Sequence, residues 1–304
     1  MAVARGVRER ETAPRWRGRE TGVALIFLAP ALLGFIAFYA WPTVRGVYLS
    51  FTDYDLLTAP DFSGLDNYRR LLTDDVFWNS LWVTLKYVVL NIGVQTVVAL
   101  ALAVLLHRLT RSTVIRGLIL LPYLISNVVV ALVWYWMADY NLGIINQMLG
   151  WVGIDAIGFF GDEAWAIPTI AGINVWRHMG YTALLIFAGL QTINRDVYEA
   201  AAVDGAGEFR IFFRITLPLL RPVLALVLVL TVIGSWQIFD TVAVTTQGGP
   251  VDATRVIQYY IFDQAFTRFD FGYASAISVV LFLILAGVAF AQLKLLRAGE
   301  SDQS

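Results

Sequence analysis

Six long apolar stretches dominate this sequence and restrict the folds open to it. They cover approximately residues 23–41, 87–106, 117–137, 167–190, 222–244 and 272–293. Each is close to the ~20 residues that a helix needs to cross a bilayer. The composition agrees, because 58% of the residues are hydrophobic and only 15% are charged, which is too apolar for an ordinary soluble domain. The sequence therefore predicts an all-α polytopic membrane protein with six transmembrane helices.

Lysine and arginine are distributed unevenly between the connecting segments. Fifteen lie in the N-terminal tail, after the second and fourth stretches and in the C-terminal tail, whereas five lie in the other three loops. Because basic residues concentrate on the cytoplasmic side, we expect both termini in the cytoplasm. The expected organisation is a tail over residues 1–22, one transmembrane domain over 23–294 and a second tail over 295–304.

The first apolar stretch also resembles a signal peptide, because an arginine-rich tail precedes it. It runs for 19 residues without a charge, whereas the apolar part of a signal peptide has ~7–15 residues. Trp41-Pro42 stands at its end instead of a small-residue cleavage site. We therefore expect an uncleaved anchor.

The sequence lacks the motifs of several classes of enzyme. The only lysines, Lys86 and Lys294, each follow leucine, so no Gly-Lys pair exists for a Walker A phosphate loop. Neither H-E-x-x-H nor G-x-S-x-G is present. With no cysteine and two separated histidines, a metal site is not expected. A net charge of -1 gives no indication of nucleic-acid binding, and we predict no catalytic residue.

A charged, glycine-bearing segment, YEAAAVDGAGEFRIFFRITLPLLRP, separates the fourth and fifth stretches. Asp196 and Glu199 have the spacing of a helix-capping pair. Gly205 permits a reversal and Asp204 can cap a second helix. That helix would place Phe209, Phe212 and Phe213 on one face. The pattern predicts a surface helix hairpin, which either anchors in lipid headgroups or docks into a protein groove.

The same segment resembles a known motif. Glu199-Ala200-Ala201, three residues, Gly205, nine residues, Ile215, one residue and Leu217-Pro218 is similar to the "EAA" signature of permease subunits of bacterial ABC importers. SFTDYD, GLDNYRRLL, LPYLISNVVVALVWYWM, YNLGIINQML and TQGGP resemble the maltose-type and glycerol-phosphate-type branch of that family. The resemblance implies a type I ABC importer permease fold in a bacterial inner membrane.

This resemblance also implies partners. They are a second, homologous permease, a dimer of ATP-binding subunits, an extracytoplasmic solute-binding protein and the surrounding lipid. ATP and Mg would be bound by the ATPase, and no cofactor by this chain. Residues 196–218 would form the cytoplasmic coupling helix loop. Its contacts with the ATPase would come from Glu199, Ala200, Ala201, Asp204, Gly205, Phe209, Phe212 and Phe213.

Polar residues within the fourth and fifth stretches are candidates for a sugar-binding site, because such residues are costly in a membrane. By position in the family motif, the site residues are Asn174, His178, Tyr181, Trp236 and Gln237. An aromatic face suits a sugar ring, while amide, imidazole and phenol groups bind hydroxyls. His178 departs from the maltose-type pattern, which has a small residue there. Lys86, Asn91 and Gln95 rank below these candidates.

Other interpretations of these residues and of the chain remain open. Asn174 can serve only to hold neighbouring helices together, Trp236 can be a packing residue, and Arg177 can pair with Asp240. The functional alternatives are a secondary solute carrier and an intramembrane lipid-linked glycosyltransferase. However, we find no convincing internal repeat and no recognisable paired-carboxylate or metal motif. Mono-, di- and oligosaccharides, polyols and glycerol phosphate are all compatible with the sequence.

Overall fold

The computed structural model describes residues 17–109 and 112–297. The first part contains α1 (Arg17–Phe35), the π-helical turn η1 (Ile36–Ala40), α2 (Trp41–Leu49), β1 (Thr52–Asp53), β2 (Asp61–Phe62), α3 (Asp66–Leu72) and α4 (Asp75–Leu109). The middle contains α5 (Thr113–Leu124), α6 (Asn127–Met137), α7 (Ile144–Trp151), α8 (Glu163–Gln191), α9 (Arg195–Val203), α10 (Glu208–Ile211), η2 (Phe212–Thr216) and α11 (Leu217–Leu219). The last part contains α12 (Arg221–Trp236), α13 (Asp240–Thr245), α14 (Ile257–Phe262), η3 (Asp263–Thr267) and α15 (Phe271–Arg297). Most of the tail 1–22 and of the tail 295–304 lies outside the described residues.

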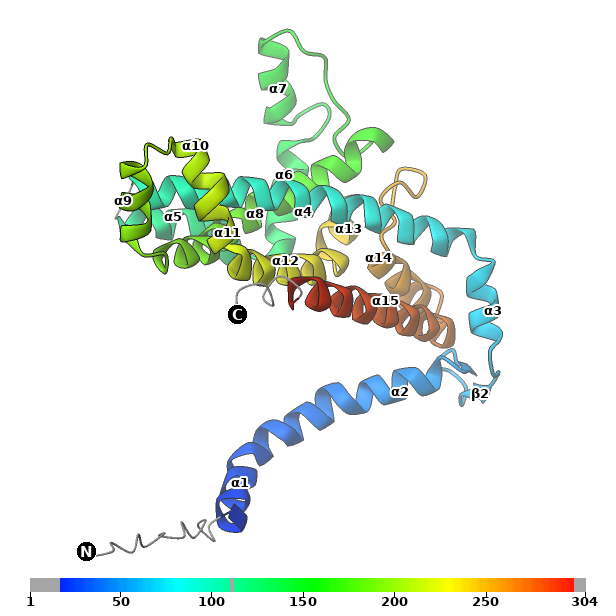
Figure 1. Cartoon of the computed structure of the whole chain (residues 1–304). Helices are drawn as coiled ribbons and strands as arrows, with labels where there is room; N and C mark the ends of the chain where they lie inside the picture. The colour runs from blue at the N-terminus through cyan, green and yellow to red at the C-terminus, as the bar shows by residue number, and fades with distance from the viewer. Residues whose placement is uncertain (1–16, 110–111, 298–304) are drawn as a thin grey trace, which may run out of the picture.

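The first helical unit, α1 to α2, extends away from the body of the molecule (Figure 1). Its apolar window contains no buried residue. The helix continues to Leu49, so the predicted end of the span at Trp41 is wrong. Pro42 does not stop it because the π-helical turn η1 lies directly before Pro42, with the Trp41 N–H bonded to the Ile36 carbonyl, and such a local adjustment accommodates a residue that has no N–H.

The remaining long helices form a bundle around α4. Helix α8 packs along α4. Helix α12 also packs on α4, and α15 packs on α12 (Figure 1). Two groups of buried apolar side chains fill the bundle, one containing Tyr87, Tyr273 and Ile277 and the other containing Ile186 and Leu220. The second, fourth, fifth and sixth apolar stretches therefore supply most of the buried core.

The third apolar stretch is broken rather than continuous. Helices α5 and α6 meet at 88°, because Ile125 and Ser126 adopt extended conformations between them. The stretch predicted to cross the membrane over 117–137 is therefore two helices rather than one, although the bent pair can still count as a single span. Hydropathy records which residues prefer lipid, but it does not report backbone dihedral angles. Helix α5 packs on α8, and α6 packs on α13.

Glycine allows the close approach of α5 to α8. A Cβ atom at Gly180 would overlap the carbonyl oxygen of Ile119.

Within the described residues, length and hydropathy identify four helices that can cross a membrane, or five if the bent pair counts as one span. Helix α8 is long enough at 29 residues, but Asn174, Arg177 and His178 make it more polar than the others.

The end of the bundle that carries α3 and α14 is held together by a polar network. Asp74, just before α4, accepts hydrogen bonds from the hydroxyls of Tyr260 and Tyr273. Gln264 donates to the Tyr260 hydroxyl over 2.7 Å, and the Arg70 guanidinium lies 3.9 Å from the centroid of the Tyr273 ring. Burial by itself would raise the pKa of Asp74, but the two tyrosine hydroxyls and nearby backbone amides hold it below its usual value. Burial and Asp74 raise the pKa of Tyr260 to about 12, so its hydroxyl keeps its proton.

Candidate functional site

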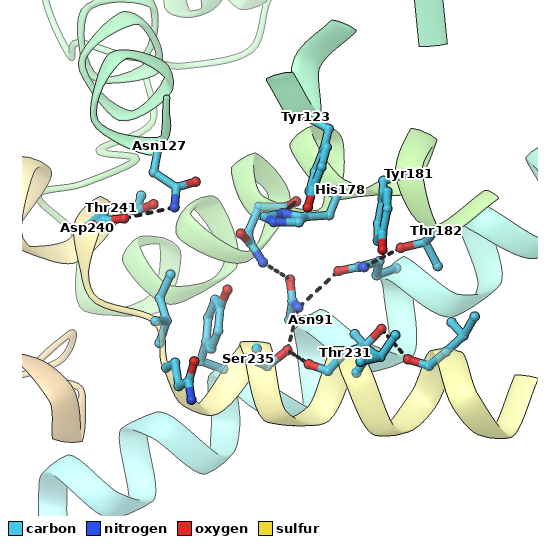
Figure 2. A pocket seen from close by; sticks show the side chains of 18 of the residues that line it. Asn91, Tyr123, Asn127, His178, Tyr181, Thr182, Thr231, Ser235, Asp240 and Thr241 are labelled. Atoms are coloured by element: carbon cyan, nitrogen blue, oxygen red, sulfur yellow. Dashed lines mark hydrogen bonds between the residues drawn. The ribbon is translucent and has the colours of Figure 1, made fainter. Parts of the chain in front are cut away.

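A polar cavity lies inside the bundle between α4, α5, α6, α8 and α12 (Figure 2). Its volume is about 320 Å³. Its wall includes Asn91, Tyr123, Asn127, His178, Tyr181 and Gln237. Aromatic groups, uncharged polar groups and the Asp240 carboxylate therefore meet within a largely apolar bundle, which is the usual composition of a small-molecule site.

Amide and hydroxyl side chains from three helices bind one another beside the cavity (Figure 2). The Asn91 amide donates to Ser235 Oγ over 2.9 Å, and the Asn174 amide donates to Asn91 Oδ1 over 3.1 Å. Gln95 donates to Thr182 Oγ1 over 2.9 Å. Asn174 is thus both a cavity residue and a link between α8 and α4.

Arg177 holds the break between α5 and α6. Its Nε and Nη2 atoms donate to the Ile125 carbonyl over 3.1 and 2.9 Å, and Nη2 also donates to the Tyr123 carbonyl over 3.1 Å. These carbonyls lie at the end of α5, where intrahelical donors run out and a positive charge is favourable. Asp240 accepts from Asn127 over 2.9 Å instead. In this structure, each member of the possible Arg177–Asp240 pair therefore has another partner.

The hydrogen bonds of His178 determine its tautomer. Arg177 Nη1 lies 3.0 Å from His178 Nε2, and because arginine only donates, Nε2 is the acceptor. Nδ1 then carries the hydrogen and donates to the Asn174 carbonyl over 3.0 Å. Both nitrogens are occupied within the protein. The expectation that the imidazole binds solute hydroxyls does not fit this geometry.

Tyr123 packs between two aromatic residues of α8. Its ring meets that of His178 edge-on, with a centroid separation of 5.6 Å and an interplanar angle of 72°. It stacks on Tyr181 with a centroid separation of 4.5 Å and an angle of 10°. One wall of the cavity is therefore an ordered aromatic layer.

The structure brings together four of the five predicted site residues. Asn174, His178, Tyr181 and Gln237 line the cavity. Trp236 does not, since its side chain is only 6% exposed and belongs to the apolar core. Neighbouring residues at the end of a helix point in different directions, so Trp236 and Gln237 do not share this wall.

Sequence reasoning missed Tyr123 and Asn127 and gave too little weight to Asn91 and Gln95. All four line the cavity. The available signal was the Pro122-Tyr123 pair and the Ser126-Asn127 pair inside an otherwise apolar stretch, because such residues mark a break in a helix.

The predicted surface hairpin is present at the other end of the bundle from α3 (Figure 1). We use the name hairpin for residues 195–216, which comprise α9, α10 and η2. Gly205 has φ +72°, which confirms the predicted reversal, because side chains disfavour this conformation. Two predicted caps are wrong. Asn194, not Asp196, caps α9 by accepting from the Asp196 amide, and α10 begins after Gly207, too far along the chain for Asp204 to cap it.

Most of the predicted coupling residues are exposed. Glu199, Ala200, Asp204, Gly205, Phe209 and Phe213 lie on the surface. Ala201 is buried, and Phe212 is half-buried against α4. The three phenylalanines therefore do not form one exposed ridge. Phe209 remains 83% exposed and Phe213 58% exposed, so both rings are free to contact lipid or another protein.

Few polar contacts connect the hairpin to the bundle. Arg108, at the end of α4, forms an ion pair with Glu208 over 2.6 Å. Within the hairpin itself, Thr216 Oγ1 donates to the Tyr198 hydroxyl over 3.4 Å, which is a long hydrogen bond. The hairpin thus keeps its shape while most of its outer surface stays uncovered.

A helical membrane bundle with an internal polar cavity and an exposed hairpin has the form of a transport permease. Residues 95–296 match the family described as "Binding-protein-dependent transport system inner membrane component", and the chain belongs to this family. It is an inner-membrane protein and a permease subunit of an ATP-binding-cassette importer.

Individual permeases and one solved transporter structure are also similar to this chain. The sulfoquinovosyl glycerol transport system permease protein SmoG of Agrobacterium fabrum is 34% identical over 93% of this chain and 94% of the relative. The trehalose/maltose transport system permease protein MalF of Thermococcus litoralis is 33% identical over 91% and 94%. A crystal structure of a bacterial ABC transporter that imports the acidic polysaccharide alginate superposes with a TM-score of 0.82, at 22% identity, over 93% of this chain and 98% of that chain.

Proposed function

We propose that this chain forms one half of the translocation path for a carbohydrate or a similar polyhydroxylated solute. The observation that carries this proposal is the cavity, whose wall combines stacked tyrosines with amides, hydroxyls and one carboxylate, Asp240. Such groups offer apolar surface to the C–H face of a sugar and hydrogen bonds to its hydroxyls. Asn174, Tyr181 and Gln237 are the solute-binding residues of the predicted set, while His178 gives shape to the wall.

The names of the relatives support this class of solute. SmoG is named for sulfoquinovosyl glycerol and MalF for trehalose and maltose. All three compounds carry many hydroxyl groups, and the two relatives match this chain over almost its entire length. We therefore place a hydroxyl-rich solute, rather than a peptide or a metal ion, in the cavity.

We further propose that the hairpin couples solute movement to ATP hydrolysis in a separate subunit. Glu199 and the exposed rings of Phe209 and Phe213 would dock on the ATPase, which binds ATP and Mg, while a sister permease forms the other half of the path. Closure and opening of the ATPase dimer would move the hairpin and the spans attached to it. The hairpin and both termini then face the cytoplasm, and this chain has no ATPase site of its own.

Reconstitution of the complete importer in liposomes tests the function. Labelled glucose, maltose, trehalose and sn-glycerol 3-phosphate are supplied with the binding protein, and uptake is measured with and without ATP inside. We expect uptake of at least one of the four, only when both the ATPase and ATP are present. Equal uptake without ATP would contradict an importer and favour a secondary carrier.

A further inference from the structure

We propose that a recess at the hairpin end of the bundle binds a phosphate group and that its occupation strengthens the attachment of the ATPase. The recess lies between the last turn of α4, the first turn of α5, the end of α8 and one face of α9 (Figure 1). Its volume is about 680 Å³, against about 320 Å³ for the cavity. The coupling part of this inference rests on the hairpin function proposed above, whereas the binding part does not.

Two basic side chains of this recess meet on one aromatic ring. The Arg116 guanidinium, from α5, lies 4.3 Å from the centroid of the Phe187 ring. His107, from α4, meets the same ring with a centroid separation of 6.1 Å and an interplanar angle of 62°. Phe187 belongs to α8, so three helices bring these groups together. Contact with a ring orients a guanidinium without cancelling its charge.

Helix α9 adds a third basic side chain. Its residues Arg195, Tyr198, Glu199 and Ala202 line the recess, because their spacing places them on one face of the helix. Arg195 and Glu199 lie one turn apart, which allows an ion pair. Nevertheless, Arg195 forms no ion pair with any residue of 17–109 or 112–297. The wall thus carries two arginines, one histidine and one carboxylate.

This set of groups suits a phosphate. Phosphate oxygens accept hydrogen bonds, and the planar guanidinium of arginine matches them in geometry and charge. Gln191 and Tyr198, also on the wall, add neutral donors. The recess lies where spans of the bundle end, so the headgroup of a phospholipid and a soluble phosphate compound both have access to it. The shared chemistry is the phosphate group itself.

Glu199 connects this site to the ATPase. It is the one acidic residue on the wall, so its charge opposes a bound anion. The proposed function places Glu199 against the ATPase. A docked ATPase that neutralises Glu199 would leave the basic groups to the phosphate. Because coupling between two binding events is reciprocal, a bound phosphate would strengthen ATPase attachment by the same factor.

The binding part is tested without the ATPase. This chain is purified with its sister permease in a non-ionic detergent, and inorganic phosphate replaces chloride at constant ionic strength. A ligand of the folded state raises the thermal unfolding midpoint. Arg195→Gln should raise the half-saturating phosphate concentration at least about threefold. Arg210→Gln is the matched control, since it removes the same charge from an exposed position of the hairpin outside the recess, and it should respond as the unaltered chain.

The control also separates binding from the general stabilisation that phosphate gives to proteins, which would raise both midpoints equally. Glu199→Gln should lower the half-saturating concentration about two- to fivefold, because it removes the opposing charge. If Arg195→Gln is already altered without phosphate, Arg116→Gln supplies the same test from another helix. Equal responses of the unaltered chain, the recess variants and the control would overturn the phosphate site.

The coupling part is tested through the Kd of the ATPase subunits for the two permeases. It is measured in detergent with and without inorganic phosphate, and in nanodiscs of phosphatidylcholine with and without phosphatidylglycerol. We expect attachment to tighten about fivefold or more. A response to inorganic phosphate identifies a soluble ligand, and a response to phosphatidylglycerol alone identifies a lipid headgroup. Either response should be lost in Arg195→Gln and kept in Arg210→Gln.

An unchanged Kd in both arms, or weaker attachment, would overturn the coupling part. Weaker attachment would mean that phosphate and the ATPase compete for the recess. If the ATPase does not bind the hairpin at all, the proposed coupling function fails, and the unfolding midpoints still decide whether the recess binds phosphate.

Discussion

The two ends of the bundle differ in how their polar and apolar side chains are placed. At the end with α3 and α14, Asp74 accepts from two tyrosine hydroxyls, and Arg70 reaches both the Tyr273 ring and Asp270. At the end with the hairpin, Glu199 and the Phe209 ring lie exposed. The first end is completed by this chain's own side chains, whereas the second leaves its surface for another molecule.

This difference shows how a permease combines a fixed framework with a part that a partner can move. The network around Asp74 ties α4, α14 and α15 together, so these elements resist separation. The hairpin has one exposed ion pair to α4, and contacts of that kind contribute little. Substitutions at the Asp74 end should therefore lower the stability of the chain, whereas substitutions on the hairpin should weaken its assembly with the ATPase.

Glu199→Lys should have the largest effect. It reverses a charge on the exposed face of the hairpin where the proposed ATPase would dock, and misplaced charge at an interface weakens binding strongly. We expect at least a tenfold loss of ATPase recovered with the purified permease pair, with an unchanged thermal unfolding midpoint. Asp155→Lys, at an exposed position outside the hairpin, is the control. Full ATPase recovery with Glu199→Lys would remove the coupling role assigned to Glu199.

Asp74→Asn should have the next largest effect, at the opposite end. The neutral amide weakens the hydrogen bonds from Tyr260 and Tyr273, and bonds to a charged, partly exposed group are worth about 1–2 kcal/mol after allowance for solvent screening. We expect a lower unfolding midpoint in detergent, with ATPase recovery unchanged once the protein is assembled. A variant as stable as the unaltered chain would show that the network does not hold this end.

The same carboxylate predicts a pH dependence. Because the folded protein lowers the pKa of Asp74, its contribution to stability is fully present above the unfolded value, about 3.9. It is lost as the pH falls through the lower, folded value. The stability difference between the unaltered chain and Asp74→Asn should therefore be constant from pH 5 to 8 and shrink below about pH 4. A difference that grows on acidification would contradict this assignment.

Arg108→Gln should have the smallest effect. The ion pair with Glu208 is short, but the two side chains are 46% and 77% exposed, and such pairs contribute about 0–1 kcal/mol. The unfolding midpoint should change little, and less at high salt. A loss as large as that of Asp74→Asn would mean that the hairpin is held as firmly as the other end, and the comparison would fail.

The helical architecture could be predicted from the sequence because it depends on the residues within each segment. Apolar stretches of membrane length tend to become helices, so all six stretches are helical over most of their length, although the third is interrupted at residues 125–126 and the fifth at residues 237–239. The reversal at Gly205 followed from the conformational freedom of glycine. Hydropathy could not show the break at Ile125, because it does not report backbone conformation, and the Arg177 side chain that binds the Ile125 carbonyl lies more than fifty positions away in the sequence.

The residues of the cavity could be predicted only in part, because the sequence does not show how helices pack against one another. A polar residue in a span indicates a buried contact, but the direction of its side chain depends on packing between helices. Asn174 and Tyr181 share the cavity face, as their helical spacing indicates. Trp236 falls into the core instead, one position before Gln237. Tyr123 is brought to Tyr181 only by the fold, so no spacing along the chain relates them.

Cysteine labelling tests the central claim most directly, because the natural sequence contains no cysteine. Single cysteines at Phe209, which is 83% exposed, and at Asp155 would be labelled with a membrane-impermeant maleimide in the purified permease pair, with and without the ATPase subunits. We predict that the ATPase protects position 209 at least tenfold and leaves position 155 unchanged. Equal labelling of position 209 in both samples would contradict docking of the ATPase on the hairpin.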